Sequence, residues 1–127
     1  MDDLKDLITI DERILKSIGS NIYIEVGEEM KVIDLLYGLL LRSGNDAAIA
    51  LPEHCSGSVE AFADLMNQTA AKLGATQSNF VNPSGYPDEN HYTTIYDMYL
   101  IFSNAISLES FVTIINSADH DAAYTNA

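Results

Sequence analysis

Basic side chains are scarce in this chain, which has 6 Lys and Arg residues against 19 Asp and Glu residues and a formal net charge of −13. A surface of that sign repels the phosphate backbones of DNA and RNA, and so few cations are too scattered to form a basic patch. The composition therefore argues against nucleic acid as a partner. We interpret the acidity as a solvated surface rather than as a cation-binding site.

Cysteine is nearly absent too, because Cys55 is the only one in the sequence. It cannot form an internal disulfide, so covalent cross-links within the chain are excluded. Cys55 ends an apolar helical run, where a small buried hydrophobic residue is the usual role. The adjacent His54 would lie on a different face of that helix, so no catalytic thiol is predicted.

Long apolar runs are missing as well. No segment approaches the roughly 20 residues of a membrane helix, and residues 1–8 lack the basic start and apolar stretch of an export signal. The length of 127 residues, with 47% hydrophobic and 20% charged content, is typical of one globular domain with a real core. We therefore predict a single domain over residues 1–127.

The N-terminal part predicts β-structure. Residues 7–10 and 22–26 are apolar or β-branched, and a brief helical segment over residues 11–18 separates them. We expect the two strands to pair as a small ribbon, followed by a turn over residues 27–29.

The remainder predicts helices. Apolar residues follow helical spacing from Val32 to Leu41, which predicts a helix central to the core. Further helices are predicted over residues 46–55 and 59–73, after a Thr94–Asp97 capping box, and after Ser107. Residues 75–93 predict a long loop, and residues 117–127 a loose tail. The side chains expected to face inward on the last three helices are Phe62, Leu65, Met66, Thr69, Leu73, Ile95, Met98, Tyr99, Phe102, Ile106, Phe111, Ile114 and Ile115.

The junction Ser43-Gly44-Asn45-Asp46 has a good structural interpretation. Gly44 would supply the positive φ of a tight turn. Ser43 would cap the second helix, with Asp46 completing a capping box, and such a cap is worth roughly 1 kcal/mol. On spacing alone, this helix cap is the better interpretation.

A wider resemblance favours a functional interpretation of this junction over the helix cap. Ser-x-Asn is one of three active-site motifs of penicillin-sensitive serine enzymes, together with Ser-x-x-Lys and Lys-Thr-Gly. The stretch LLYGLLLRSGNDAA over residues 35–48 resembles the serine D-alanyl-D-alanine carboxypeptidases, the low-molecular-mass penicillin-binding proteins. Further similar stretches follow the family's order, and together they span about residues 7–116. They are IYIEVGE over 22–28, LGATQSNFVNP over 73–83, and HYTT over 91–94 with Asp97.

The resemblance implies roles for two residues. Ser43 would pass a proton between the nucleophile and the departing D-alanine, and the Asn45 amide would hydrogen-bond the substrate and the catalytic lysine. In the complete enzymes a serine forms an acyl-enzyme, a lysine acts as base, and backbone donors hold the oxyanion. The resemblance implies no cofactor and no metal. The partners of the complete enzyme would be peptidoglycan stem peptides and β-lactams.

The other two motifs are missing from this sequence. No lysine is followed by Thr-Gly, and the residues three positions before Lys5, Lys16, Lys31 and Lys72 are Asp2, Arg13, Glu28 and Thr69. We therefore expect an excised segment with an added Met1, inactive by itself, from a protein that works outside the cytoplasmic membrane. A non-catalytic binding or scaffold module is the alternative, and a generic helical interaction domain is a weaker one.

The expected fold is mainly α with a small β-ribbon, the helical lobe of the penicillin-binding and serine β-lactamase-like fold. An isolated lobe would expose apolar surface, so self-association is expected. One departure lies in the long loop, where Ser84-Gly85-Tyr86 stands in place of the family's usual histidine before the glycine and leucine after it. Asn82, Gly85 and His91 are interpreted as residues that shape this loop, and His91 as a structural residue rather than a metal ligand.

Overall fold

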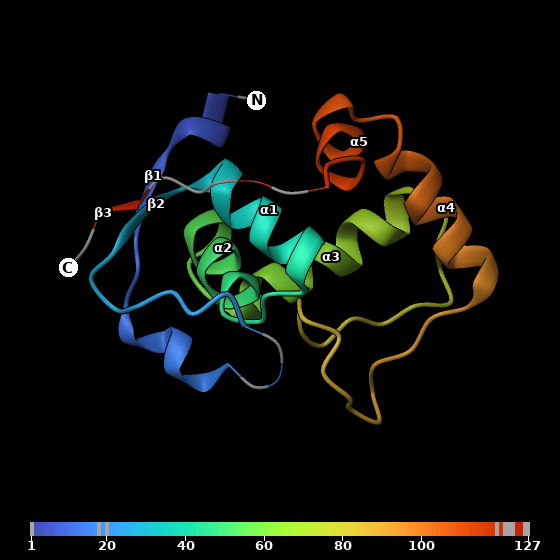
Figure 1. Ribbon diagram of the computed structural model, residues 1–127. Coiled ribbons are helices and arrows are strands. Elements are labelled where there is room, and N and C mark those ends of the chain that lie inside the picture. Colours follow the sequence, from blue (N-terminus) through green and yellow to red (C-terminus); the bar gives the residue numbers. More distant parts are fainter. Residues whose placement is uncertain (1, 18, 20, 119, 121–123, 126–127) are drawn as a thin grey trace.

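The computed structural model describes residues 2–17, 19, 21–118, 120 and 124–125. Within them, helices make up most of the structure and three short strands lie at one end (Figure 1). The elements in chain order are η1 Asp2–Lys5, β1 Leu7–Thr9, η2 Glu12–Lys16, β2 Glu29–Lys31, α1 Val32–Arg42, α2 Ala47–Ser56, α3 Val59–Lys72, α4 Ile95–Ala105, α5 Glu109–Ile115 and β3 Tyr124–Thr125. This mainly helical architecture with a small sheet confirms the predicted fold class.

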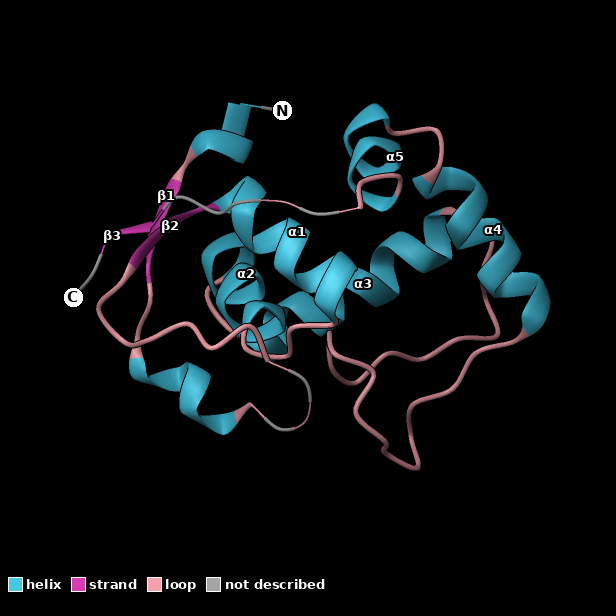
Figure 2. Cartoon of the chain, in the orientation of Figure 1, coloured by secondary structure: helices cyan, strands magenta, loops and turns pink. Residues whose placement is uncertain are grey.

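The strands form an antiparallel sheet in the order β1-β2-β3 (Figure 2). Ile8 of β1 is paired with Met30 of β2, and Met30 is paired with Tyr124 of β3. The side chains of Ile8 and Met30 are buried, so one face of the sheet closes the core beside α1.

The predicted strand over residues 22–26 is wrong, because β2 at residues 29–31 takes its place beside β1. Tyr23 has a φ of 61°, which breaks the extended conformation. The backbone N–H groups of Ile22 and Ile24 donate to the Asp46 carboxylate, so they are not available to a neighbouring strand. The turn also comes earlier than predicted, at residues 26–27, and Glu29 already belongs to β2.

The core lies between the sheet, α1 and α2. The predicted helix from Val32 is confirmed as α1, and its Leu35 has no exposed surface. The predicted second helix is confirmed as α2, which includes Pro52. The last turn of α2 extends beyond the core, so Cys55 is exposed and its predicted burial is wrong. The buried core residues of this cluster are Ile8, Ile10, Ile14, Met30, Val32, Leu35, Ala47, Ala50 and Leu51.

The last three helices are present as predicted, but most of their expected inward side chains are not buried. Ala63, Ala70 and Ile114 are the buried apolar residues of α3 and α5, whereas Leu65 and Thr69 of α3 are exposed. Helix α4 lies at the end of the molecule far from the sheet, where few elements contact it (Figure 1). Its apolar stripe is therefore exposed, and the burial predicted for the α4 side chains is wrong. The exposed fractions are 93% for Ile95, 45% for Met98, 65% for Tyr99, 52% for Phe102 and 47% for Ile106.

The C-terminal segment predicted as a loose tail is only partly described. Residues 119, 121–123 and 126–127 lie outside the described residues. Tyr124 and Thr125 form β3, which adds a third strand to the predicted ribbon. Strand β2 thus lies between β1 from the N-terminal part of the chain and β3 from the C-terminal part (Figure 2).

Candidate functional site

The junction of α1 and α2 differs from the predicted helix cap. Ser43 ends α1 with a φ of 52° and a ψ of 42°, and the backbone N–H of Gly44 after it donates to the carbonyl of Gly38 at 3.1 Å. Ser43, rather than Gly44, therefore takes the left-handed conformation, and its side chain is exposed. Helix α2 is capped by Asp46, whose carboxylate accepts from the N–H of Ala47 at 2.9 Å. Both local predictions, a positive φ at Gly44 and a cap from Ser43, are wrong.

A glycine is needed at position 44 because a larger residue would lack space there, and not because of its φ. A Cβ atom at this position would lie 3.0 Å from Cγ2 of Ile22, 3.1 Å from Oδ1 of Asp46 and 3.2 Å from the carbonyl oxygen of Gly38. A side chain at position 44 would therefore be crowded on three sides, and the left-handed conformation lies at the exposed Ser43 next to it. The Ser-Gly-Asn turn is therefore a tightly packed structure that presents Ser43 to solvent.

Asp46 also anchors the chain that precedes β2. Its carboxylate accepts from Ile22 N–H at 3.1 and 3.2 Å and from Ile24 N–H at 3.2 Å. In return, its own N–H donates to Oδ1 of Asn21 at 3.1 Å. Sequence reasoning treated Asp46 as a partner in a cap and missed this role, since nothing local indicates donors more than twenty residues away.

Asn45 is half-buried and lines a cavity of about 310 Å³. The walls come from three parts of the sequence: η2 with the residue after it, the stretch from Asn45 through α2 to the start of α3, and the loop over residues 82–86. Sequence analysis named only Asn45 in this cavity as a site residue. The other described residues that line it are Arg13, Lys16, Ser17, Ala48, Ile49, Glu53, Ser58, Val59, Glu60, Asn82, Pro83, Ser84 and Tyr86.

Arg13 lines this cavity and holds two carboxylates at its edge. Its guanidinium forms ion pairs with Asp11 and Glu53 and donates to the carbonyl of Gly57 at 3.1 Å. Burial raises the pKa of the Glu53 carboxyl and the charge of Asp11 adds to this rise, while Arg13 opposes it. The hydrogen bond from Arg13 lowers the pKa of Asp11 in turn. Two carboxylates thus share one guanidinium at the edge of the cavity.

The long loop reaches the cavity through Asn82, as the interpretation of Asn82 and Gly85 as loop-shaping residues predicts. The Asn82 side chain accepts from the N–H of Gly85 at 2.7 Å and donates to the carbonyl of Tyr86 at 2.9 Å. His91 is structural as predicted, because its Nδ1 accepts from the N–H of Val81 at 3.1 Å.

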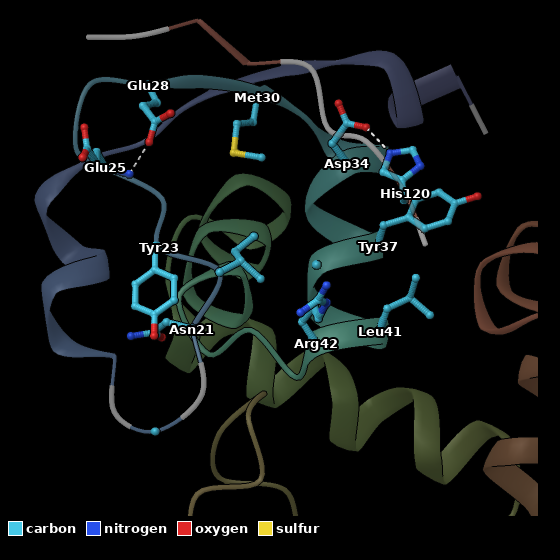
Figure 3. Close-up of a pocket in the computed structure, with 13 residues that line it drawn as sticks. Asn21, Tyr23, Glu25, Glu28, Met30, Asp34, Tyr37, Leu41, Arg42 and His120 are labelled. Carbon is cyan, nitrogen blue, oxygen red and sulfur yellow. Dashed lines mark hydrogen bonds and ion pairs between the residues drawn. The ribbon is translucent and has the colours of Figure 1, made fainter. Parts of the chain in front are cut away.

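A second, larger groove of about 730 Å³ is lined by α1 and by residues of the segment that leads into β2 (Figure 3). His120 lies on one wall of the groove, where its Nε2 is 2.6 Å from Oδ1 of the buried Asp34. Its ring stacks on the ring of Tyr37, with the two ring centroids 3.7 Å apart. On the opposite wall, the buried Glu28 accepts from the N–H of Glu25. Ser43 and Asn45 are not among the described residues that line this groove. The structure therefore places the sequence-predicted pair outside it, with Asn45 in the smaller cavity.

Two negative findings apply to the described residues. No cluster of three or more His, Cys, Asp or Glu side chains is arranged there to hold a metal ion. Among the same residues, no single helix has the length and apolar character needed to cross a bilayer.

Comparison with known proteins gives consistent matches. The family described as D-alanyl-D-alanine carboxypeptidase matches residues 3–126. The D-alanyl-D-alanine carboxypeptidase DacF of Bacillus subtilis (strain 168) is 39% identical over 107 residues, which are 84% of this chain and 28% of that protein.

Solved structures agree with this match. The D-alanyl-D-alanine carboxypeptidase DacD of Francisella tularensis superposes with a TM-score of 0.80 and 39% identity, covering 87% of this chain and 26% of that one. Penicillin binding protein 5 of Haemophilus influenzae superposes with a TM-score of 0.82 and 33% identity, covering 87% and 33%. The chain thus spans about a quarter to a third of these relatives, and the likeness includes the helical lobe that the sequence predicts.

Proposed function

Because the chain belongs to the D-alanyl-D-alanine carboxypeptidase family, we propose that it supplies the Ser43–Asn45 wall of a peptidase cleft. In the complete enzyme, Ser43 would relay the proton to the departing D-alanine, and Asn45 would hold the substrate peptide. The observation that supports this most directly is the α1–α2 turn, which presents Ser43 to solvent and sets Asn45 into a cavity. A hydroxyl both donates and accepts, and an amide pairs with a peptide carbonyl without adding charge, so both suit these roles.

The substrate class and location follow from the same family membership. The complete enzyme would trim D-alanine from peptidoglycan stem peptides through an acyl-enzyme, outside the cytoplasmic membrane, and β-lactams would acylate it. The 127-residue chain has no Ser-x-x-Lys and no Lys-Thr-Gly. Losing a covalent nucleophile removes many orders of magnitude of rate, and a helper serine does not replace it.

The chain itself is therefore expected to form no covalent adduct with penicillin. The measurement is incubation with a fluorescent penicillin, followed by gel fluorescence and intact-protein mass spectrometry. A complete family enzyme serves as the positive control. A stable adduct on any serine of this chain, Ser43 included, would show that it carries its own nucleophile and would overturn this assignment.

A non-catalytic peptide-binding module is the second candidate. The described residues form a cavity of about 310 Å³ beside Asn45, which a peptide side chain could enter. Half a cleft offers few polar contacts, and its affinity for an acyl-D-Ala-D-Ala peptide should be weak. A shift of the Asn45 side-chain amide signals on titration would show binding, and its absence would leave an inert lobe.

The apolar face of α4, formed by Ile95, Met98, Tyr99, Phe102 and Ile106, is proposed to cause self-association. We expect the apparent mass from light scattering to rise with protein concentration, and Tyr99→Glu to suppress that rise. Tyr23→Glu is the matched control, since Tyr23 is 87% exposed and lies in a different part of the fold. A wild-type protein that stays monomeric at high concentration would contradict the proposal.

A further inference from the structure

The side-chain amide of Asn45 lies close to the backbone of Gly19. A Cβ atom at position 19 would be 2.8 Å from Nδ2 of Asn45, whereas ordinary van der Waals contact begins at 3.4 Å. Gly19 also has a φ of 92°, in the left-handed region that favours glycine. The absence of a side chain at position 19 therefore lets this backbone approach the amide that the proposed function assigns to substrate binding.

Asn21 ties the chain beside Gly19 to the α1–α2 turn. Its Oδ1 accepts from the Ser17 hydroxyl at 3.0 Å and from the N–H of Asp46 at 3.1 Å. Ser17 and Asn21 lie on either side of Gly19 in the sequence, and Asp46 directly follows Asn45. The approach of Gly19 to the Asn45 amide is therefore set by hydrogen bonds between the residues that flank them.

We propose that Gly19 is a positioning residue for Asn45, which keeps the side-chain amide in the orientation that pairs with a carbonyl of the substrate peptide. This inference rests on the proposed function and deepens it. Hydrogen bonds weaken steeply when the donor is misaligned, so a rotation of the amide would cost binding. Asn45 lines the cavity of about 310 Å³, whereas Gly19 lines the larger groove. The effect of Gly19 on a peptide in the smaller cavity must therefore pass through Asn45.

A methyl group at position 19 would act on the amide before it acted on the fold. Nδ2 is the far end of a flexible side chain, so rotation about the side-chain bonds of Asn45 relieves the close contact. The strain of an alanine at positive φ is a separate cost, which arises at any left-handed glycine. Gly19→Ala is therefore expected to fold and to turn the Asn45 amide away from its wild-type orientation.

The experiment compares Gly19→Ala with Gly74→Ala in the full chain. Gly74 has a φ of 84°, and a Cβ atom there would lie 3.8 Å from Cδ1 of Leu100, an ordinary contact. Gly74→Ala therefore carries the backbone strain without the clash, and urea unfolding should show a comparable loss of stability in both variants. Without ligand, only Gly19→Ala should shift the NMR signals of the Asn45 side-chain amide.

The same samples are then titrated with acetyl-D-Ala-D-Ala, and binding is followed through the backbone amide of Ala48, which lines the cavity with Asn45. Gly19→Ala should bind this peptide about fivefold more weakly than the wild-type protein, the loss of one neutral hydrogen bond. Gly74→Ala should bind it with wild-type affinity.

The outcomes separate this inference from the proposed function. Unchanged Asn45 amide signals in Gly19→Ala, an equal shift in Gly74→Ala, or wild-type peptide affinity in Gly19→Ala would each refute the positioning role while the peptide site stands. If the wild-type protein does not respond to the peptide, the proposed function fails and the positioning role fails with it.

A double variant decides the result if Gly19→Ala does not fold. Gly19→Ala/Asn45→Ala removes the side chain that the new methyl group would meet. Recovery of the fold in this variant would support the close contact with Asn45 as the cause. Continued failure to fold would overturn the inference, because the strain would then lie in the backbone of position 19.

Discussion

Replacing Asp46 with alanine is expected to destabilise the protein more than any other single polar substitution near the site. Asp46 is only 2% exposed, and its carboxylate accepts from three backbone N–H groups, those of Ile22, Ile24 and Ala47. Alanine would leave these donors without their acceptor and would remove the cap of α2. Hydrogen bonds to a buried charge are worth about 1.5–3 kcal/mol each, so a loss of at least roughly 3 kcal/mol is expected.

The loss of stability should be largest in the segment that Asp46 anchors, residues 21–25. Residues 21–25 have no strand partner, so without the carboxylate this segment should detach from the start of α2. The turn over residues 43–45 should then lose its defined position. The measurements are urea unfolding for the free energy and hydrogen exchange for the amides of Ile22 and Ile24. Protection of these two amides should fall more than that of the α3 amides.

Two variants make this test specific. Asp46→Asn keeps the shape and one acceptor oxygen, so its effect should lie between wild type and Asp46→Ala. Asp64→Ala removes an exposed carboxylate on α3 and controls for the change in net charge. An unfolding midpoint for Asp46→Ala equal to that of Asp64→Ala would show that the three hydrogen bonds contribute nothing measurable.

The helices could be predicted from the sequence because their signals are local. The apolar spacing of α1 and the Thr94 cap of α4 depend on residues within a few positions of one another. The strand over residues 22–26 could not be excluded in this way. Its apolar alternation is genuine, but the acceptor for its N–H groups is Asp46, and no local pattern indicates that contact.

Burial was less predictable than helix position. Periodicity identifies the apolar face of α4, yet it says nothing about whether another element covers that face. Ile95 at 93% exposure is the clearest case. The candidate site shows the same limit, because its motif identifies Ser43 and Asn45, while the residues opposite Asn45 come from segments that only the fold brings together.

Asp97 provides the second large effect, through the long loop. Its side chain is 1% exposed, and Oδ2 accepts from the N–H of Gln77 at 2.7 Å and from the Ser78 hydroxyl at 2.6 Å. Thr94 Oγ1 accepts from the Asp97 N–H, which is one half of the predicted capping box, while the Asp97 carboxylate accepts from donors in the loop. Asp97 therefore joins the start of the loop over residues 75–93 to the first turn of α4.

Asp97→Ala is expected to cost roughly 2–4 kcal/mol, since two donors lose a buried charged acceptor. It should also speed hydrogen exchange over residues 76–80, where the loop begins, while exchange in α1 changes only in line with global stability. Asp88→Ala is the matched control, because Asp88 is exposed and accepts a local hydrogen bond from the N–H of Asn90.

Since the same loop carries Tyr86 to the cavity, Asp97→Ala should weaken peptide binding at Asn45 although Asp97 does not line that cavity. Unchanged exchange over residues 76–80 in Asp97→Ala would show that the loop is anchored elsewhere.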